Sequence, residues 1–538
     1  MPLVERQANR AGVGRAMRLG APNKGPKGGV GVIGLCVCAE LVILSPVLIV
    51  VFESATGGWH AFYQAFSGGD LIGLVAHTLL VSGLATPLCA IIGTSCAWLV
   101  TRCQIPASKM WLVLCVMPLT IPAVIASYSW AGMSHATQGL LGAVLVTVLT
   151  YFPLVFLLVS AALRGLDPSF EDVSMSLGNS SVKTFFKTTL PQLRPALVGS
   201  LLLVALDSLV EFDAFSALKY QTFTTDIYAQ LQTSFSFVRA SSLSLVSVVI
   251  CIGVLYLEYV VRGGAQFTPL RWGARRVQRT IGLGRLKYVG LGFLMVVSGA
   301  SVGVPLGSLA VWFIRSHHPT QLVTGQNAHY LLVSSLTSLG FGLGGAIFAV
   351  ILAFPVVLYL KTRHNRLSVM FERGTYLAFA LPDLVGALAL SYGVSRLAGP
   401  LYQTIPVLIF AYAILFVPLA VVALKVVLEQ VEPRIFDVAQ SLEGSRWRTL
   451  LKIIVPLIWP GLAAGAVLIF AFTVGDLATT QVLIPPGMYT LETQFWSNAN
   501  TVAFGAGAPY ALVLLVLAGL CAYLLAGNFG KLTRRVEV

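Results

Sequence analysis

Four acidic side chains within long apolar stretches are the residues of this chain best suited to chemistry. Asp207, Glu211 and Asp213 lie close together, and Glu211 aligns with Asp476 at an internal offset of 265 residues. Ionisable groups inside apolar segments are costly and by default indicate function. Carboxylates suit a hard cation such as ferric iron, which prefers oxygen ligands. The alternative is that these acids pair with backbone or a neighbouring side chain, or contact another protein.

Other polar residues give weaker signals. The adjacent His317 and His318 lack a third ligand, so the sequence leaves any metal-binding residues unknown. Four further polar residues in apolar stretches are expected to be satisfied by packing: His77, Glu40, Glu258 and Asp383.

No phosphate-binding loop of the Gly-x-x-x-x-Gly-Lys-Ser/Thr type occurs in the sequence. Gly530-Lys531 lacks both the earlier glycine and the hydroxyl residue that such a loop requires. We therefore expect no catalytic residues and no cofactor bound by this chain.

The elements that must position these acids are membrane helices. The chain has 538 residues, of which 57% are hydrophobic and only 10% are charged. Soluble domains carry roughly 25% charged residues, so this composition indicates lipid as the main solvent. Apolar stretches of about 20 residues predict an all-α integral membrane protein with twelve transmembrane helices. They cover roughly 30–52, 72–100, 111–133, 139–163, 195–218, 241–261, 288–314, 331–360, 375–394, 403–424, 460–483 and 507–527.

The positive charges indicate how these helices are oriented. An even number of spans places both termini on one side, and that side then holds 31 of the 35 lysines and arginines. By the positive-inside rule the N- and C-termini are cytoplasmic. The net charge of +14 is therefore a topology signal, and we expect no nucleic-acid partner.

The sequence is internally duplicated. Pro46 matches Pro305, and Pro122 matches Pro382, at offsets of 259 and 260 residues. Two six-span halves with the same orientation form a parallel repeat, with a pathway expected between them. The predicted regions are a basic cytoplasmic segment (1–29), a first half (30–261), a basic cytoplasmic linker (262–287), a second half (288–527) and a cytoplasmic tail (528–538). The linker is expected to lie against anionic lipid headgroups.

The cytoplasmic loop after the fourth span of each half is the most strongly repeated segment. At an offset of 265, 11 of the 31 positions from 167 to 197 are identical. An acid followed by proline, Asp167-Pro168 or Glu432-Pro433, predicts a helix start. The apolar residues Phe170, Val173 and Leu177 recur at helical spacing. The stripe predicts a short helix that rests on lipid or docks on a cytoplasmic partner, and Pro191 and Pro456 are expected to break the chain before the next span.

These loops resemble the EAA motif of permease subunits of ABC importers, which reads Glu-Ala-Ala, three residues, Gly and later Leu-Pro. The first copy matches at Asp172, Val173, Ser174, Leu177, Gly178 and Pro191. The second copy matches at Asp437, Val438, Ala439, Leu442, Glu443, Gly444 and Pro456. Aspartate replaces glutamate in both copies, and Glu443 occupies the glycine position of the second, with Gly444 one residue later.

The segment FTTDIY at 223–228, and the segment from Ile484 to Leu491, are similar to fused permeases of the ferric-iron importer family. Thiamine, polyamine and phosphonate permeases share this architecture. The resemblance implies a type I ABC importer fold in the bacterial inner (plasma) membrane. It also implies two cytoplasmic ATPase subunits, which bind ATP and Mg²⁺, and an extracytoplasmic substrate-binding protein.

Two other classes of membrane protein fit the sequence less well. An ion-coupled secondary transporter also uses parallel repeats, but it needs no motor and hence no duplicated docking loop. A membrane enzyme is disfavoured because the sequence shows no clustered His, Asp and Glu residues.

Overall fold

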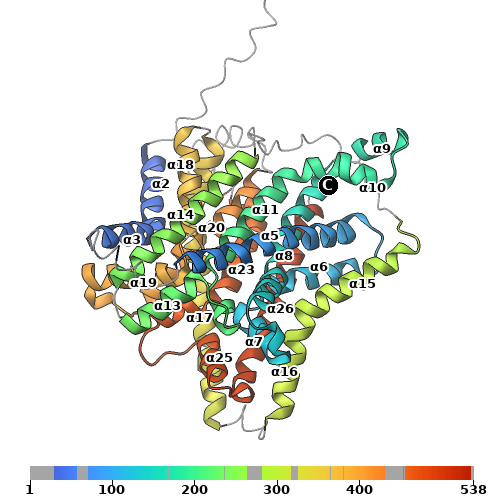
Figure 1. The fold of residues 1–538 in the computed structure, drawn as a ribbon. Coiled ribbons are helices and arrows are strands. Elements are labelled where there is room, and N and C mark those ends of the chain that lie inside the picture. The colour runs from blue at the N-terminus through green and yellow to red at the C-terminus, as the bar shows by residue number, and fades with distance from the viewer. Residues whose placement is uncertain are drawn as a thin grey trace, which may run out of the picture.

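The computed structural model describes residues 30–56, 63, 71–166, 169–234, 237–262, 282–316, 325–363, 365–379, 381–429, 452 and 455–534, and within these ranges it contains helices and no strands (Figure 1). The first half comprises α2 (Val30–Ile43), α3 (Ser45–Thr56), α5 (Leu71–Arg102), α6 (Ser108–Val116), α7 (Ala123–Met133), α8 (Leu140–Gly165), α9 (Ser169–Ser176), α10 (Ser181–Thr184), α11 (Leu190–Val210), α12 (Asp213–Ala217), α13 (Phe223–Ser234) and α14 (Phe237–Arg262). The second half comprises α15 (Leu286–Ser298), α16 (Val304–Arg315), α17 (Gly325–Thr362), α18 (Arg366–Phe379), α19 (Asp383–Leu397), α20 (Ile405–Glu429), α23 (Val455–Val474), α24 (Leu477–Leu483), α25 (Leu491–Asn500) and α26 (Phe504–Arg534). Short 3₁₀ or π turns lie at Met117–Thr120, His135–Thr137, Phe185–Thr189, Gly299–Gly303 and Gly399–Leu401.

The described residues contain 8 single helices long and apolar enough to cross a membrane, and up to 12 spans if each bent helix pair counts as one. This confirms the predicted all-α membrane fold. Hydropathy did not predict the bends themselves. The third span of each half bends sharply, by 94° between α6 and α7 and by 98° between α18 and α19. Pro122 and Pro382 cap the second helix of these pairs with extended ψ angles of 132° and 134°. Proline has no N–H to continue a helix and disfavours helical backbone just before it, which explains the break.

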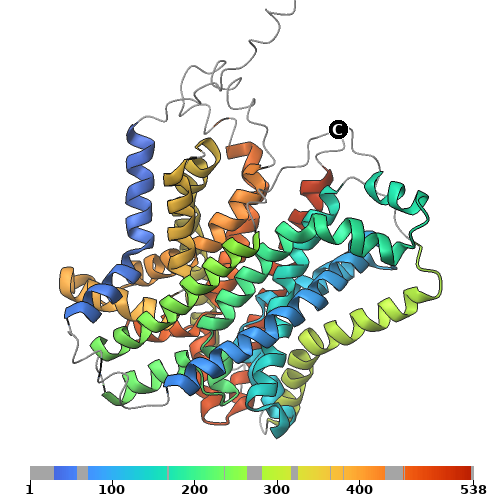
Figure 2. The ribbon, with the colours of Figure 1, turned by 45° about the horizontal axis from the view of Figure 1, so that its top comes forward.

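The first span of each half packs on the opposite half. Helix α2 of the first half contacts α17, and α3 contacts α19, while α16 of the second half contacts α7. The helices α5, α11 and α14 lie side by side (Figure 2). The largest apolar core draws residues from both halves, for example Leu206 and Tyr412. The two halves are therefore connected by helices that pack across their boundary as well as by the continuous chain.

Pro191 does not interrupt the helix, contrary to the expectation from sequence. The π turn Phe185–Thr189 leads directly into α11, and Leu190 donates its N–H to the carbonyl of Phe185. A π turn shifts the hydrogen-bond register by one residue, and Pro191 then falls in the first turn of α11, where no N–H is needed. Pro456 lies in the first turn of α23, and residues 453 and 454 before it are outside the described part.

Candidate functional site

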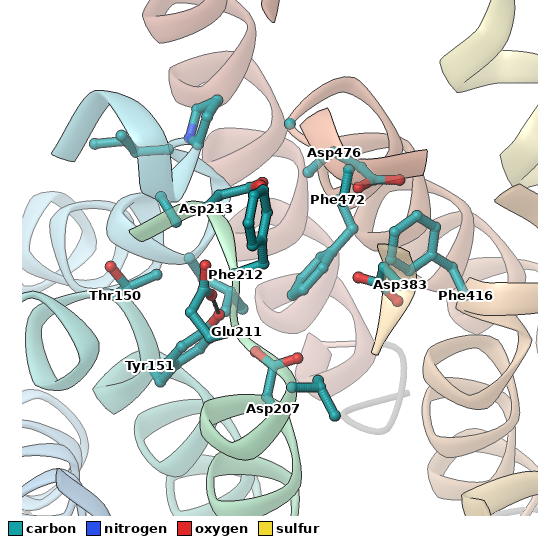
Figure 3. Close-up of a pocket in the computed structure, with 18 of the residues that line it drawn as sticks. Thr150, Tyr151, Asp207, Glu211, Phe212, Asp213, Asp383, Phe416, Phe472 and Asp476 are labelled. Carbon is teal, nitrogen blue, oxygen red and sulfur yellow. Dashed lines mark hydrogen bonds between the residues drawn. The ribbon is translucent and has the colours of Figure 1, made fainter. Parts of the chain in front are cut away.

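A cavity of about 80 Å³ lies where the two halves meet. A water molecule needs roughly 10–15 Å³ by this measure, so the cavity has room for several waters or a small ion. Its walls come from the segment between α6 and α7, from α8, and from the breaks after α11 and α23, together with the start of α19 (Figure 3). Five carboxylates line it: Asp207, Glu211, Asp213, Asp383 and Asp476. All four acids singled out from the sequence thus share one cavity.

Two of these carboxylates occupy equivalent helix breaks. Glu211 ends α11 and accepts a hydrogen bond from the backbone N–H of Ala214 at 2.9 Å. Asp476 caps α24 and accepts one from the N–H of Thr479 at 3.3 Å. Both acids and both donors are related by the offset of 265 residues. A carboxylate at a helix N-terminus is favoured because it satisfies a free N–H and faces the positive end of the helix dipole.

The surroundings of these two acids differ. The hydroxyl of Tyr151, on α8, donates to the second oxygen of Glu211 (Figure 3). The equivalent position in the second half is Phe416, which also lines the cavity but has no hydroxyl to donate. In that half Tyr412 instead bonds Thr480.

Several acidic oxygens of the cavity have no hydrogen-bond partner in the described part of the chain. They are Oδ2 of Asp207, Oδ1 of Asp213 and Oδ2 of Asp476. Asp207 and Asp476 are more than nine-tenths buried, at 9% and 6% exposure. Among the described residues that line the cavity there is no lysine, arginine or histidine. Buried carboxylate oxygens without donors or nearby counter-charges are unfavourable, so this cavity has an unmet demand for positive charge.

The described acids of the cavity do not form a complete metal-binding site in this conformation. Among the described residues, no group of three or more His, Cys, Asp or Glu side chains could hold a metal ion. Figure 3 shows Asp207 and Glu211 on one side of the cavity and Asp383 and Asp476 on the other.

Asp383, which the sequence grouped with the packing residues, lines the cavity. It opens α19 directly after the 98° break, and this bend brings it to the cavity. Its position after Pro382, the repeat partner of Pro122, was the available sequence signal. The other three residues grouped with it, His77, Glu40 and Glu258, are not among the cavity's lining residues.

A second feature is the helix α9 in the first repeated loop. Its first turn contains Glu171 and Asp172, and the predicted start at Asp167-Pro168 lies outside the described residues. The predicted apolar stripe is unpartnered: Phe170, Val173 and Leu177 are 51%, 58% and 78% exposed. An exposed apolar stripe of this kind indicates a surface that lipid or another protein covers.

Two small residues of the loop have structural roles. The hydroxyl of Ser174 is buried and lies 3.1 Å from that of Thr184 in α10. Gly178, with φ of +84°, donates its N–H to Met175 and ends α9. Only glycine adopts this left-handed backbone without strain, which explains its place after the helix.

Helix α9 is attached to the membrane helices through Glu171. Its Oε1 lies 3.4 Å from Nη2 of Arg102, at the end of α5, and accepts a hydrogen bond from Thr189 at 3.0 Å. Arg102 is 1% exposed. This pair could not be singled out from the sequence, because neither residue belongs to the motif.

The residues predicted for the second loop, from Asp437 to Gly444, lie outside the described part of the chain. Most of the basic segments at 1–29 and 262–287 also lie outside it.

Comparison with known proteins adds an independent finding. The family model for the "binding-protein-dependent transport system inner membrane component" matches residues 41–261 and 345–535, once per half. The Fe(3+)-transport system permease protein FbpB 2 of Haemophilus influenzae is 33% identical over 91% of this chain and 97% of its own length. The ferric transport system permease protein FbpB of Actinobacillus pleuropneumoniae is 22% identical over 84% of this chain and 70% of its own. The sulfate transport system permease protein CysT of Escherichia coli is 26% identical, over 41% of this chain and 86% of its own.

Proposed function

The chain belongs to the binding-protein-dependent transport system inner membrane components, a family of ABC permeases, and we propose that it forms the pathway of a ferric-iron importer. The observation that carries the choice of substrate is the cavity between the halves, whose described lining has five carboxylates and no basic residue. The permease itself is a transport subunit, and energy has to come from a partner that hydrolyses ATP.

The charge of the cavity favours a cation over an anion. Sulfate would face uncompensated negative charges in a low-dielectric setting, where like-charge repulsion is strong. The likeness to a sulfate permease therefore supports the shared architecture and not a shared substrate. Ferric iron is a hard cation that prefers oxygen ligands, and carboxylates supply them.

The exposed stripe of α9 supports docking on a cytoplasmic ATPase subunit. In this proposal one ATPase, with its ATP and Mg²⁺, binds α9, and a second binds the repeated loop within 425–459. The ion pair between Glu171 and Arg102 connects α9 to α5, so a movement of the ATPase reaches a membrane helix.

Transport then follows from relative movement of the halves. A binding protein delivers iron on the extracytoplasmic side, while both termini lie in the cytoplasm. ATP binding rocks the halves so that the cavity opens outward, and hydrolysis returns it inward. The cavity is bounded by both halves, so such a movement changes its access without any change within a helix.

Docking is tested by co-purification of the tagged chain with its ATPase subunits. We expect Leu177→Asp to lower the recovered ATPase about 10-fold, because a charge on the stripe has to be desolvated on docking. Leu397→Asp, which changes an 89% exposed leucine at the end of α19, should leave recovery unchanged. A wild-type chain that retains no ATPase would contradict the proposal.

Substrate is tested by uptake in cells that express the complete system, with ⁵⁵Fe(III), radiolabelled sulfate and radiolabelled thiamine offered in parallel. We expect iron alone to accumulate in a manner that needs this chain. Iron uptake that is unchanged when the chain is deleted, or chain-dependent uptake of sulfate or thiamine, would contradict the choice of ferric iron.

A further inference from the structure

Glu492 is a buried acid close to the cavity but absent from its lining. It is the second residue of α25, behind the cap Thr490, and it is 1% exposed. Neither of its carboxylate oxygens accepts a hydrogen bond from any residue that the structure describes. Helix α25 lies at the end of the molecule opposite α9 (Figure 1), and it is not one of the candidate spans.

The charges that act on Glu492 are all negative. Burial, followed by the charges of Asp213, Asp476 and Glu211, raises its pKa well above the usual value. Glu492 has no ion-pair partner within the described part of the chain. Asp213 and Asp476 each carry an unpartnered oxygen as well. Helix α25 packs on α24, which Asp476 caps, and Asp476 lines the cavity together with Asp213. Three acids with unpartnered oxygens therefore lie on adjoining elements beside the cavity.

The repeat shows that this burial is specific to the second half. Thr224-Thr225-Asp226 corresponds to Thr490-Leu491-Glu492, at an offset of 266. Asp226 is only partly buried, and it accepts a hydrogen bond from Nε2 of Gln230 at 2.7 Å. The acid at this helix start therefore has a hydrogen-bond donor in the first half and none among the described residues in the second.

A buried carboxylate without a donor is strongly unfavourable unless it is neutralised, and a multivalent cation can neutralise several such groups at once. We propose that Glu492, Asp213 and Asp476 bind the hard multivalent cation on its way from the outer face into the cavity. This assignment rests on the proposed function and adds a residue that lies behind the cavity wall.

The site is divided between the two halves, because Asp213 belongs to the first and the other two residues to the second. Among the described residues, no three acids are close enough to hold a metal ion in this conformation. Relative movement of the halves changes the distance of Asp213 from its two partners, so the site binds most tightly in one state of the transport cycle.

The test uses the full complex with its ATPases in phosphatidylcholine nanodiscs, both nucleotide-free and trapped with ATP and vanadate. The probe is Tb³⁺, a hard trivalent cation whose luminescence is sensitised by nearby tyrosines such as Tyr412, which bonds Thr480 of α24. We expect saturable Tb³⁺ binding in at least one state. Loss of a supporting residue in a metal site costs roughly 10–100-fold in affinity, so Glu492→Gln should weaken binding by at least about 10-fold.

Two variants serve as matched controls. Glu492→Asp keeps the charge and should restore most of the affinity, and Asp226→Asn should bind Tb³⁺ like the wild type. Wild-type affinity in Glu492→Gln, or an equal loss in Asp226→Asn, would overturn the assignment. If Glu492→Gln fails to assemble, Asp213→Asn and Asp476→Asn take its place, and unchanged affinity in both would overturn it equally.

The failure of this inference is distinguishable from failure of the proposed function. ATP-driven iron uptake that Glu492→Gln leaves intact, together with unchanged Tb³⁺ binding, would remove Glu492 from the pathway and leave the ferric-iron permease standing. A wild-type chain that binds no ATPase subunit and supports no iron uptake would instead contradict the proposed function.

Discussion

The two halves share the same helix breaks but surround them with different side chains. Glu211 and Asp476 occupy equivalent positions and cap equivalent helices. Around them the first half contributes Asp207 and Asp213, where the second half has Phe472 and Ala478 at the same offset. The first half thus supplies three carboxylates to the cavity, and the second half supplies two carboxylates together with Phe416 and Phe472.

The repeated loops differ as well. In the first loop Glu171 joins α9 to Arg102 through an ion pair. The residue at the equivalent position of the second loop is Phe436, which carries no charge. The comparison shows that duplication preserved the backbone plan and the capping acids, while the remaining charges diverged. Function is therefore expected to be unequally sensitive to matched changes in the two halves.

The largest expected effect concerns the ion pair of the first loop. Arg102→Met leaves Glu171 without its charged partner, and breaking a buried pair in this way costs about 3 kcal/mol. We expect a clearly lower midpoint of thermal denaturation in detergent, and partial recovery in the double variant Arg102→Met with Glu171→Met. An unchanged midpoint for Arg102→Met would show that the pair does not hold α9 in place.

The next effect tests whether iron uptake depends on which half supplies a carboxylate or only on the number of carboxylates in the cavity. Asp207→Phe removes a cavity carboxylate whose Oδ2 has no partner among the described residues, and we expect iron uptake to fall about 30-fold, within the range for loss of a residue that supports a metal. Adding Phe472→Asp returns a carboxylate at the equivalent position and should recover about half of that loss on a logarithmic scale. Recovery to the full wild-type rate would mean that the asymmetry has no function.

The smallest effect comes from Tyr151→Phe, which makes the first half resemble the second. Glu211 loses one donor but keeps the N–H of Ala214, so the cost is one hydrogen bond of about 1 kcal/mol. We expect initial iron uptake to fall about fivefold, whereas Phe416→Tyr should leave it within a factor of about two. A larger loss of iron uptake in Phe416→Tyr than in Tyr151→Phe would contradict the view that the tyrosine hydroxyl is needed beside Glu211 and not beside Asp476.

Much of this fold was predictable because hydropathy acts on whole segments. The offset of 265 residues also pairs Glu211 with Asp476 from the sequence alone. Bends were harder to predict, because hydropathy registers that a segment is apolar and not where it turns. Asp383 was missed for this reason, since a 98° bend brings it into the cavity. Glu492 was missed because it lies in a segment between spans whose burial depends on tertiary packing.

Pro191 shows the opposite case, in which a local rule predicted a break that the fold avoids. The rule that proline ends a helix holds for an α-helical register, but the π turn before Pro191 shifts that register. Sequence alone does not reveal such a turn, because its cost is offset by packing of α11 against α5 and α8.

The central claim is that the carboxylates at the two helix breaks carry ferric iron in an ATP-dependent manner. The most direct measurement is ATP-driven accumulation of ⁵⁵Fe from its binding protein into proteoliposomes that contain the complete complex. We expect the wild type and Glu40→Gln, a change at a buried acid outside the cavity, to accumulate iron. The double variant Glu211→Gln with Asp476→Asn should assemble and hydrolyse ATP but accumulate none. Accumulation by this double variant at the wild-type rate would contradict the account.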